Sequence, residues 1–424
     1  MLEFFSNIIC GIFLPIALIL VGIYFLFKLR FFYILHPIKA FKSMCKGGFK
    51  SLSVALAGTL GIGNIVGVSS ALISGGAGAI FWMWISAFIA MSVKYCEVVL
   101  AMKCRNTDNN GNYYGGAPYY IYDGFKSKFG IRVSKVLACI FAFLCTVNSL
   151  STGNLVQINA VSSLVPIKKF AFGIAFALLV LLIILGGIKR ISKFTSFLMP
   201  ILSVIYIIVS FFVIFSSIEL LPSILSSIIK EAFTFKSAIS GFCGYGIMSA
   251  IRYGTSRGLL SNEAGCGTSP CAHASSSTAN IHSQGCLGIF EVFIDTIVLC
   301  TLTALVILIG DIKCDNAMSL VIKAFEKCTG ITGKYIVIIS CLLFALATIV
   351  CQYYYGIESL KFITQKKWCQ ALFTCAFIFV TVIGATIPMS LMWQISDIVI
   401  ATMTILNLFC LFALRKQIKE APFN

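Results

Sequence analysis

A repeated pattern of apolar runs, each about 20 residues long and separated by short polar segments, constrains this chain more than any other feature. A helix of about 20 residues crosses a hydrocarbon core of about 30 Å. Inside lipid the backbone groups of such a segment must bond to one another, which favours helices. We therefore predict an all-α integral membrane protein with about eleven transmembrane helices, near residues 8–27, 53–73, 78–101, 134–162, 169–187, 195–216, 237–252, 285–309, 335–355, 369–387 and 391–414.

The composition argues against a soluble protein. Only 11% of the 424 residues are charged and the mean hydropathy is +0.98, whereas soluble domains carry roughly 25% charged residues. The net charge of +17 would suggest a nucleic-acid partner in a soluble protein. Here the basic residues lie in short loops between apolar runs, as topology signals do. The expected partner is the lipid bilayer and not nucleic acid.

The distribution of lysine and arginine predicts the orientation. With alternating spans, most basic residues fall on one side, in loops around 28–50, 103–135, 189–193, 252–257, 361–367 and 415–419. Cytoplasmic loops are enriched in these residues, so we expect the N-terminus outside and the C-terminus in the cytoplasm. The run at 8–27 is long enough to remain as a helix and lacks the cleavage site of a signal peptide. The expected location is a bacterial inner cell membrane.

The runs also suggest an internal repeat. Without the first run, ten remain, and they divide into two sets of five. Because five is odd, the second set is inverted relative to the first. The predicted parts are a leading helix with a basic inner loop (1–50), a first repeat (51–216), an outer loop (217–236), a second repeat (237–414) and a cytoplasmic tail (415–424).

Each set opens with a glycine-rich run, ALAGTLGIGNIVGVSS at 55–70 and ISGFCGYGIMSAIRYG at 239–254. Glycine weakens a helix by about 1 kcal/mol relative to alanine, so several in one span favour a break. Interrupted spans at matching places in two halves point to the binding site of a transporter. The alternative is that the glycines only allow close helix packing.

Several motifs resemble the alanine/glycine:cation symporter family. They are GIGNIVGVSSALISGGAGAIFWMW at 61–84, GGAPYYI at 115–121, GNLVQIN at 153–159, GGIKRISKFTSFLMP at 186–200, RGLLSNEAGCGTSP at 257–270, FIDTIVLCTLTA at 293–304, YYG at 354–356 and MWQISDI at 392–398. The resemblance implies a leucine-transporter fold, with two inverted five-helix repeats after one extra helix. It implies a secondary active symporter that moves a small neutral amino acid, alanine- or glycine-like or more polar, with sodium by alternating access.

The residues themselves suggest how an amino acid binds. A helix broken in mid-membrane exposes N–H groups that can hold a carboxylate, and C=O groups that can hold an ammonium. Candidates near the first break are Thr59, Gly61, Gly63 and Asn64. Carbonyl groups around Gly241 and Gly244 could hold the ammonium.

Further along the chain, Asn154 and Gln157 are polar residues in an apolar run. They are candidates for additional substrate contacts. The alternative for both is hydrogen bonding between helices.

The resemblance also implies a sodium site, with sodium as the coupling ion and no other cofactor. Its ligands would be the carbonyl groups of Ala57 and Leu60 and hydroxyls at two successive later positions. This chain has Ala347 and Thr348 there, so one hydroxyl is missing. A proton-coupled or exchange-type transporter of the same fold is therefore the alternative.

Gln352 replaces a tryptophan that is common in the family. Glutamine offers two donors and an acceptor, and it is smaller than an indole. If it lines the substrate pocket, we expect a preference for polar or somewhat larger neutral amino acids over alanine. If it points at a neighbouring helix or at water, selectivity is unchanged.

Other ionisable residues suggest local roles. Glu97 follows Lys94 by three residues, as in a helical ion pair, and Glu291 and Asp295 share a helix face on which they could relay protons or ions. The segment 261–265 is expected to be an inner loop that can gate.

Metal, catalytic and redox roles have weaker signals. The spacing of Cys266, Cys271, His273 and His282 matches no common zinc signature. Catalytic motifs are absent, so we expect no enzyme, and a channel or membrane-embedded enzyme is unsupported. Two further cysteines at 314 and 328 fall in one predicted outer loop, as a disulfide or, slightly favoured, as free thiols.

Overall fold

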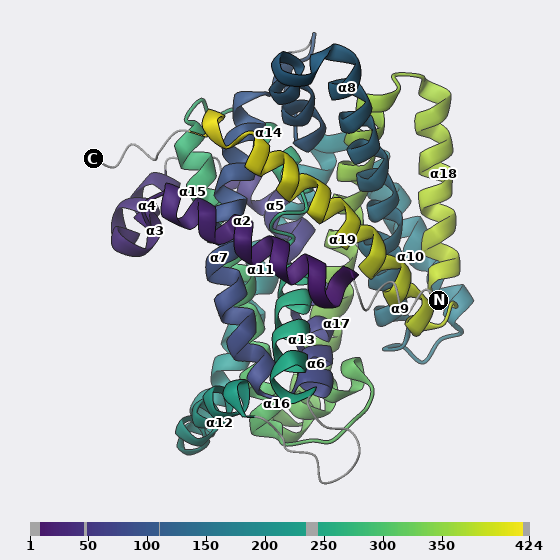
Figure 1. The fold of residues 1–424 in the computed structure, drawn as a ribbon. Helices are drawn as coiled ribbons and strands as arrows, with labels where there is room; N and C mark the ends of the chain where they lie inside the picture. The colour runs from purple at the N-terminus through teal and green to yellow at the C-terminus, as the bar shows by residue number, and fades with distance from the viewer. Residues whose placement is uncertain (1–8, 46–48, 110, 235–244, 419–424) are drawn as a thin grey trace.

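The computed structural model describes residues 9–45, 49–109, 111–234 and 245–418. It is helical almost throughout (Figure 1). The α-helices are α2 (Leu14–Lys28), α3 (Phe32–Leu35), α4 (Pro37–Met44), α5 (Phe49–Thr59), α6 (Val66–Gly75), α7 (Gly78–Lys103), α8 (Ala117–Leu150), α9 (Val156–Ser162), α10 (Lys169–Ile184), α11 (Gly187–Ser216), α12 (Leu221–Phe233), α13 (Tyr245–Asn262), α14 (Pro270–Ala274), α15 (Ile281–Val292), α16 (Thr301–Gly310), α17 (Ala317–Ile363), α18 (Lys367–Gly384) and α19 (Met389–Ala413).

Shorter elements join these helices. The π-helical turns are η1 (Ile9–Phe13), η3 (Ser151–Leu155) and η5 (Phe293–Cys300), and the 3-10 turns are η2 (Ile62–Asn64), η4 (Ile218–Leu220) and η6 (Arg415–Gln417). Strands β1 (Asn106–Thr107) and β2 (Tyr113–Tyr114) form an antiparallel hairpin in which Asn106 pairs with Tyr114.

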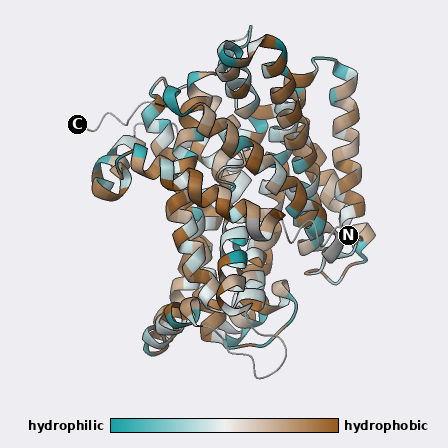
Figure 2. Cartoon of the chain, viewed as in Figure 1, coloured by the Kyte–Doolittle hydropathy of each residue, from teal (hydrophilic) through white to brown (hydrophobic). Residues whose placement is uncertain are grey.

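The helices have the length and composition of membrane spans. Eight described helices are long and apolar enough to cross a bilayer, or up to nine if the bent pair formed by α5 and α6 is one crossing. Helix α10 is a shorter apolar helix. Apolar residues cover much of the ribbon between the two ends of the molecule (Figure 2). The predicted all-α membrane class is confirmed, and the count of about eleven crossings stays a prediction.

The broken pair of helices lies inside the bundle. Helix α6 packs against α13 and α17, α5 packs against α11 and α17, and α13 also packs along α7. Helices α2 and α19 cross the face turned to the viewer in Figure 1. They shield the interior from lipid, because one flank of each is exposed and apolar, as Phe13, Leu20 and Phe409 illustrate.

Two long helices bend at glycines. Helix α8 bends at Gly130 and α17 bends at Gly330, with φ values of 79° and 70°. A side chain at either position would meet nothing within 4 Å, so the backbone conformation and not crowding requires glycine. Each bend precedes the third core helix of its predicted repeat, and the repeat boundaries stay a prediction.

The predicted outer loop at 217–236 contains helix α12. Glu231 accepts a hydrogen bond from the Ala77 N–H at 3.0 Å, at the start of α7. The indole of Trp82 donates to the Ala232 carbonyl at 3.1 Å. These contacts bind α12 across the end of α7, and Figure 1 shows it at the bottom of the molecule.

Candidate functional site: the break between α5 and α6

The first glycine-rich run breaks in the middle of the protein. Helix α5 ends at Thr59, α6 begins at Val66, and the two are bent by 58°. Gly61 is extended, and its N–H donates to Asn64 Oδ1 at 3.1 Å. The Ile62 N–H donates to Gln157 Oε1 at 3.0 Å. The predicted break is confirmed, and side chains satisfy the backbone groups that it frees.

The second glycine-rich run is described only in part. Gly241 and Gly244 lie outside the described residues, and α13 begins at Tyr245.

The two glycines of the first break allow other elements to approach it. A Cβ at Gly61 would lie 2.5 Å from Thr348 Oγ1 and 3.0 Å from Gln157 Oε1. A Cβ at Gly63 would lie 3.1 Å from the backbone of Ser261 in α13. The break is therefore a point where segments distant in the sequence meet.

Two of the predicted sodium ligands, Leu60 and Thr348, are in contact at the break. Thr348 Oγ1 donates to the Leu60 carbonyl at 3.3 Å, and Ala57, Leu60 and Ala347 are buried. A hydroxyl and a main-chain carbonyl are hard oxygen donors of the kind that alkali cations take. Thr59 turns its hydroxyl back to the Ala55 carbonyl of its own helix at 3.3 Å.

Of the two polar residues that follow α8, Gln157 reaches the break and Asn154 does not. Asn154 Nδ2 donates to the Phe377 carbonyl and to Thr381 Oγ1 of α18, each at 2.9 Å. This is the hydrogen bonding between helices that stood as the alternative for Asn154.

A buried acid of η5 ties the break to α13, a role that sequence reasoning missed. Asp295 Oδ1 accepts from Asn64 Nδ2 at 2.8 Å, and Asp295 Oδ2 accepts from Ser261 Oγ and Thr296 Oγ1, both at 2.8 Å. The sequence signal was an acid in an apolar run, which marks a functional position.

The predicted ion pair between Glu97 and Lys94 is wrong, because Lys94 pairs with another acid. Lys94 pairs with Glu291 at 3.3 Å, and His273 also contacts Glu291 at 3.1 Å. Glu291 and Asp295 therefore have separate sets of partners in the described chain, which gives a direct relay between them no support.

Glu97 instead holds the predicted gating loop. Its carboxylate accepts from the N–H groups of Gly265 and Gly267, at 3.1 and 2.8 Å, and from Asn407 Nδ2 at 2.6 Å. Helix geometry alone predicted that Glu97 pairs with Lys94. Three donors from segments distant in the sequence bind the Glu97 carboxylate instead.

Gln352 is buried between the break and the loop after α13. Its Nε2 donates to Glu263 Oε1 at 2.7 Å and to the Gly58 carbonyl at 3.4 Å. A Cβ at Gly153 would lie 2.6 Å from Gln352 Cβ. The two amide hydrogens are thus engaged within the protein, and Oε1 has no partner among the described residues.

The cysteine and histidine candidates have other neighbours. Cys314 and Cys328 are free thiols that pack against the apolar core. Cys266 contacts Thr404 at 3.1 Å, and His282 contacts Tyr95 at 2.7 Å. Cys271 is buried against the same core.

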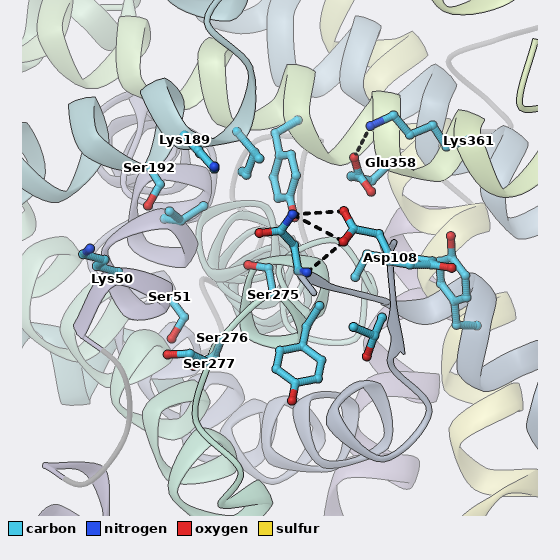
Figure 3. Close-up of a pocket in the computed structure, with 18 of the residues that line it drawn as sticks. Lys50, Ser51, Asp108, Lys189, Ser192, Ser275, Ser276, Ser277, Glu358 and Lys361 are labelled. Carbon is cyan, nitrogen blue, oxygen red and sulfur yellow. Dashed lines mark hydrogen bonds and ion pairs between the residues drawn. The ribbon is translucent and has the colours of Figure 1, made fainter. Parts of the chain in front are cut away.

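A large cavity, the vestibule, is lined by residues of the first turns of α5 and of several loops. It has a volume of about 1380 Å³ and is lined by Lys50, Ser51, Val54, Thr107, Asp108, Asn109, Asn112, Tyr113, Tyr114, Tyr119, Ile188, Lys189, Ser192, Lys193, Ser196, Ser275, Ser276, Ser277, Tyr354, Glu358, Lys361, Gln365, Lys367 and Gln370. In Figure 3, Lys189 and Ser192 lie on one side of this vestibule and Glu358 and Lys361 on the other. Val54 lies six residues before Leu60, or about 9 Å along a helix.

Described contacts join α6, α13 and α19 on the other side of the break. The Arg257 carbonyl lies beside Gly67, one turn beyond the break in α6. The Arg257 guanidinium pairs with Asp397 of α19 at 3.0 Å and stacks over the Trp393 ring at 4.6 Å. This ion pair joins α13 to α19 on the α6 side of the break, whereas the vestibule lies on the α5 side. The prediction that Arg257 lies with the basic loops at 28–50, 189–193 and 361–367 is therefore wrong.

The comparisons with known proteins agree with this architecture. Residues 1–422 match the model of the sodium:alanine symporter family. The sodium/alanine symporter AgcS of Methanococcus maripaludis is 35% identical over 86% of this chain and 81% of its own length. The probable sodium/glutamine symporter GlnT of Bacillus subtilis is 32% identical, over 96% and 86%.

Solved structures share the fold at low sequence identity. A Na⁺-coupled sialic acid symporter in its outward-open state has a TM-score of 0.52 at 12% identity, covering 97% of this chain and 82% of its own. MhsT in complex with L-phenylalanine has a TM-score of 0.51 at 13% identity, covering 87% and 97%. The predicted leucine-transporter-like class is confirmed. The chain belongs to the sodium:alanine symporter family, whose members are membrane transporters and not enzymes.

Proposed function

We propose that this chain is a secondary active symporter that moves a small neutral amino acid together with sodium. The observation that carries the proposal is the contact between Thr348 Oγ1 and the Leu60 carbonyl at 3.3 Å, beside a helix break. A sodium ion between the Thr348 hydroxyl and the Leu60 carbonyl would take both oxygens as ligands, in place of the hydrogen bond between them. The names of the relatives AgcS and GlnT, which are sodium symporters for alanine and glutamine, support sodium coupling.

The amino acid binds at the break itself in this proposal. The N–H groups of Gly61 and Ile62 are held by the amide oxygens of Asn64 and Gln157. A substrate carboxylate would displace these weaker neutral acceptors, because hydrogen bonds to a charged group are about twice as strong. Gly63 lets α13 pack closely against the break, since a Cβ there would lie 3.1 Å from Ser261 Cα. The carbonyl groups near Gly241 and Gly244 remain the proposed partners of the ammonium group.

The vestibule and the ion pair support alternating access. One end has a cavity with five lysines, and on the other side of the break Arg257 and Asp397 form an ion pair. Lysines line cytoplasmic loops, so the vestibule faces the cytoplasm in the proposed orientation. Transport would then require the ion pair to open as the vestibule closes.

A proton-coupled or exchange-type transporter is the second candidate. It is favoured by Ala347, which supplies no hydroxyl, and by the buried Asp295 beside Asn64. A carboxylate in this position can exchange a proton in place of binding sodium.

Uptake into proteoliposomes distinguishes the two candidates. We expect labelled neutral amino acid to accumulate when sodium is outside, and to stop accumulating when potassium replaces it at constant pH. Sodium coupling is wrong if a pH gradient drives the same uptake in potassium alone.

Substitutions at the two successive positions 347 and 348 should have opposite effects on sodium affinity. Thr348→Val removes a ligand hydroxyl and should raise the sodium concentration for half-maximal uptake by about tenfold, since a hydrogen bond or ligand to a charged group is worth about 1.5–3 kcal/mol. Ala347→Ser restores the missing hydroxyl and should lower it. Sodium titrations at saturating amino acid measure both, and unchanged sodium dependence in both variants removes this site.

Gly61 and Gly67 form a matched pair of glycine positions. Gly61→Ala forces a methyl group to within 2.5 Å of Thr348 Oγ1, so uptake should fall at least tenfold while insertion is retained. Gly67→Ala meets its nearest neighbour at 3.8 Å and should transport normally. Equal uptake by both variants would show that the approach to Gly61 is not needed.

A further inference from the structure

A group of buried polar side chains lies near the break without partners in the described part of the chain. Both the Nδ2 and Oδ1 atoms of Asn148 lack a hydrogen bond there, as do Thr152 Oγ1, Ser396 Oγ and Gln352 Oε1. All four side chains are buried, with exposed fractions of 3% or less. Buried polar groups in native proteins are almost always paired with protein groups, water or a ligand. Asn154 Oδ1, Ser210 Oγ and Arg257 Nε also lack a described partner.

Contacts at Gly267 set the register of α8 against α19. A Cβ on Gly267 would lie 2.7 Å from Phe141 Cζ and 3.3 Å from Asn407 Cγ. Further along, Asn159 donates to the Gly384 and Ile387 carbonyls, just before α19 begins. The two helices therefore run antiparallel between these two contacts.

This register brings Thr152 and Ser396 to one level. Asn148 follows Phe141 by seven residues in α8, so the two share one helix face, and Thr152 lies about one turn further on, in the π-helical turn η3. Ser396 precedes Asn407 by eleven residues and shares its face in the same way. Thr152 and Ser396 thus lie about 16 Å from Gly267 in the same direction.

The segment around Thr152 lies next to the break. Gln352 packs on Gly153, next to Thr152, and its Nε2 reaches the Gly58 carbonyl of α5. Gln157, about one turn beyond, binds the Ile62 N–H. Gln352 therefore lies beside the break, and along the neighbouring helix Thr152 and Asn148 lie about 7 Å and about 13 Å from Gln157.

We infer that Asn148, Thr152 and Gln352 form a subsite for the side chain of the transported amino acid, and that this side chain is a neutral carboxamide or hydroxyl. The inference rests on the proposed symport and names its substrate class. Asn148 offers a donor and an acceptor, which complement a primary amide. Gln352 offers only an acceptor, because Glu263 and Gly58 take its amide hydrogens.

The same chemistry disfavours other side chains. A methyl group leaves every one of these atoms unpaired, and sites built to hydrogen-bond a substrate group discriminate strongly against analogues that lack it. A carboxylate brings no donor for Gln352 and adds a second negative charge near Glu263. Glutamine, asparagine, serine and threonine fit, whereas alanine and aspartate do not.

The test is competition for sodium-driven uptake of labelled glutamine and labelled alanine into proteoliposomes. Unlabelled asparagine, serine, alanine and glycine serve as competitors. The native protein should rank the amides and hydroxyl amino acids ahead of alanine. Asn148→Leu and Thr152→Val should each weaken the polar competitors about tenfold and leave alanine competition unchanged or improved.

Three controls keep the result decisive. Thr152→Ser retains the hydroxyl and should retain the native ranking, even if Asn148→Leu fails to insert. Thr146→Val lies on the same helix, where its hydroxyl bonds to the Ala142 carbonyl, and should not change the ranking. An unchanged ranking in Thr152→Val, or a native ranking led by alanine, overturns the subsite. Sodium-driven alanine uptake that persists in such a case leaves the proposed symport intact, whereas loss of sodium dependence for every amino acid refutes the symport itself.

Discussion

The break in the first core helix is the constraint on which the rest of the structure depends. Between Thr59 and Val66 the regular helical bonding stops in a region without water, where each unsatisfied backbone group is costly. Side chains from three other segments offset this cost. Gln157 accepts a hydrogen bond from the Ile62 N–H, Thr348 donates to the Leu60 carbonyl, and Asp295 accepts from the Asn64 side chain. A break that is contacted by α17, η5 and α9 is also a place where a ligand can replace one set of hydrogen bonds with another.

Buried charges organise the elements around the break. Lys94 of α7 joins Glu291 of α15, and Glu97, one turn further along α7, binds the loop that follows α13. Paired charges inside a membrane protein are expensive to separate. We infer that α7, α15 and this loop move as one body, and that changes of state are confined to contacts that are easier to break, such as the pair formed by Arg257 and Asp397.

The sequence predicted what depends on local pattern and on motif resemblance. Apolar runs located the helices, and glycine spacing located the break. The family resemblance predicted that Thr348 lies near Leu60, although the two are 288 residues apart in the sequence. Local pattern could not predict which donors surround a buried acid, so Glu97 was assigned to Lys94 and the contact between Asp295 and Asn64 was missed. The bends at Gly130 and Gly330 were missed because an isolated glycine in a polar stretch does not indicate that a helix changes direction there. Asn148 and Thr152 had a usable signal, since polar residues four apart in an apolar run share one helix face.

The central claim is that sodium and a neutral amino acid bind together at this break. Equilibrium binding of labelled glutamine to the purified protein in detergent, without any gradient, tests it most directly. Two ligands coupled at adjoining sites must each raise the affinity of the other by the same factor. The account predicts that sodium strengthens amino-acid binding at least fivefold over potassium, and that the amino acid strengthens sodium binding equally. Equal amino-acid affinity in sodium and in potassium would contradict it.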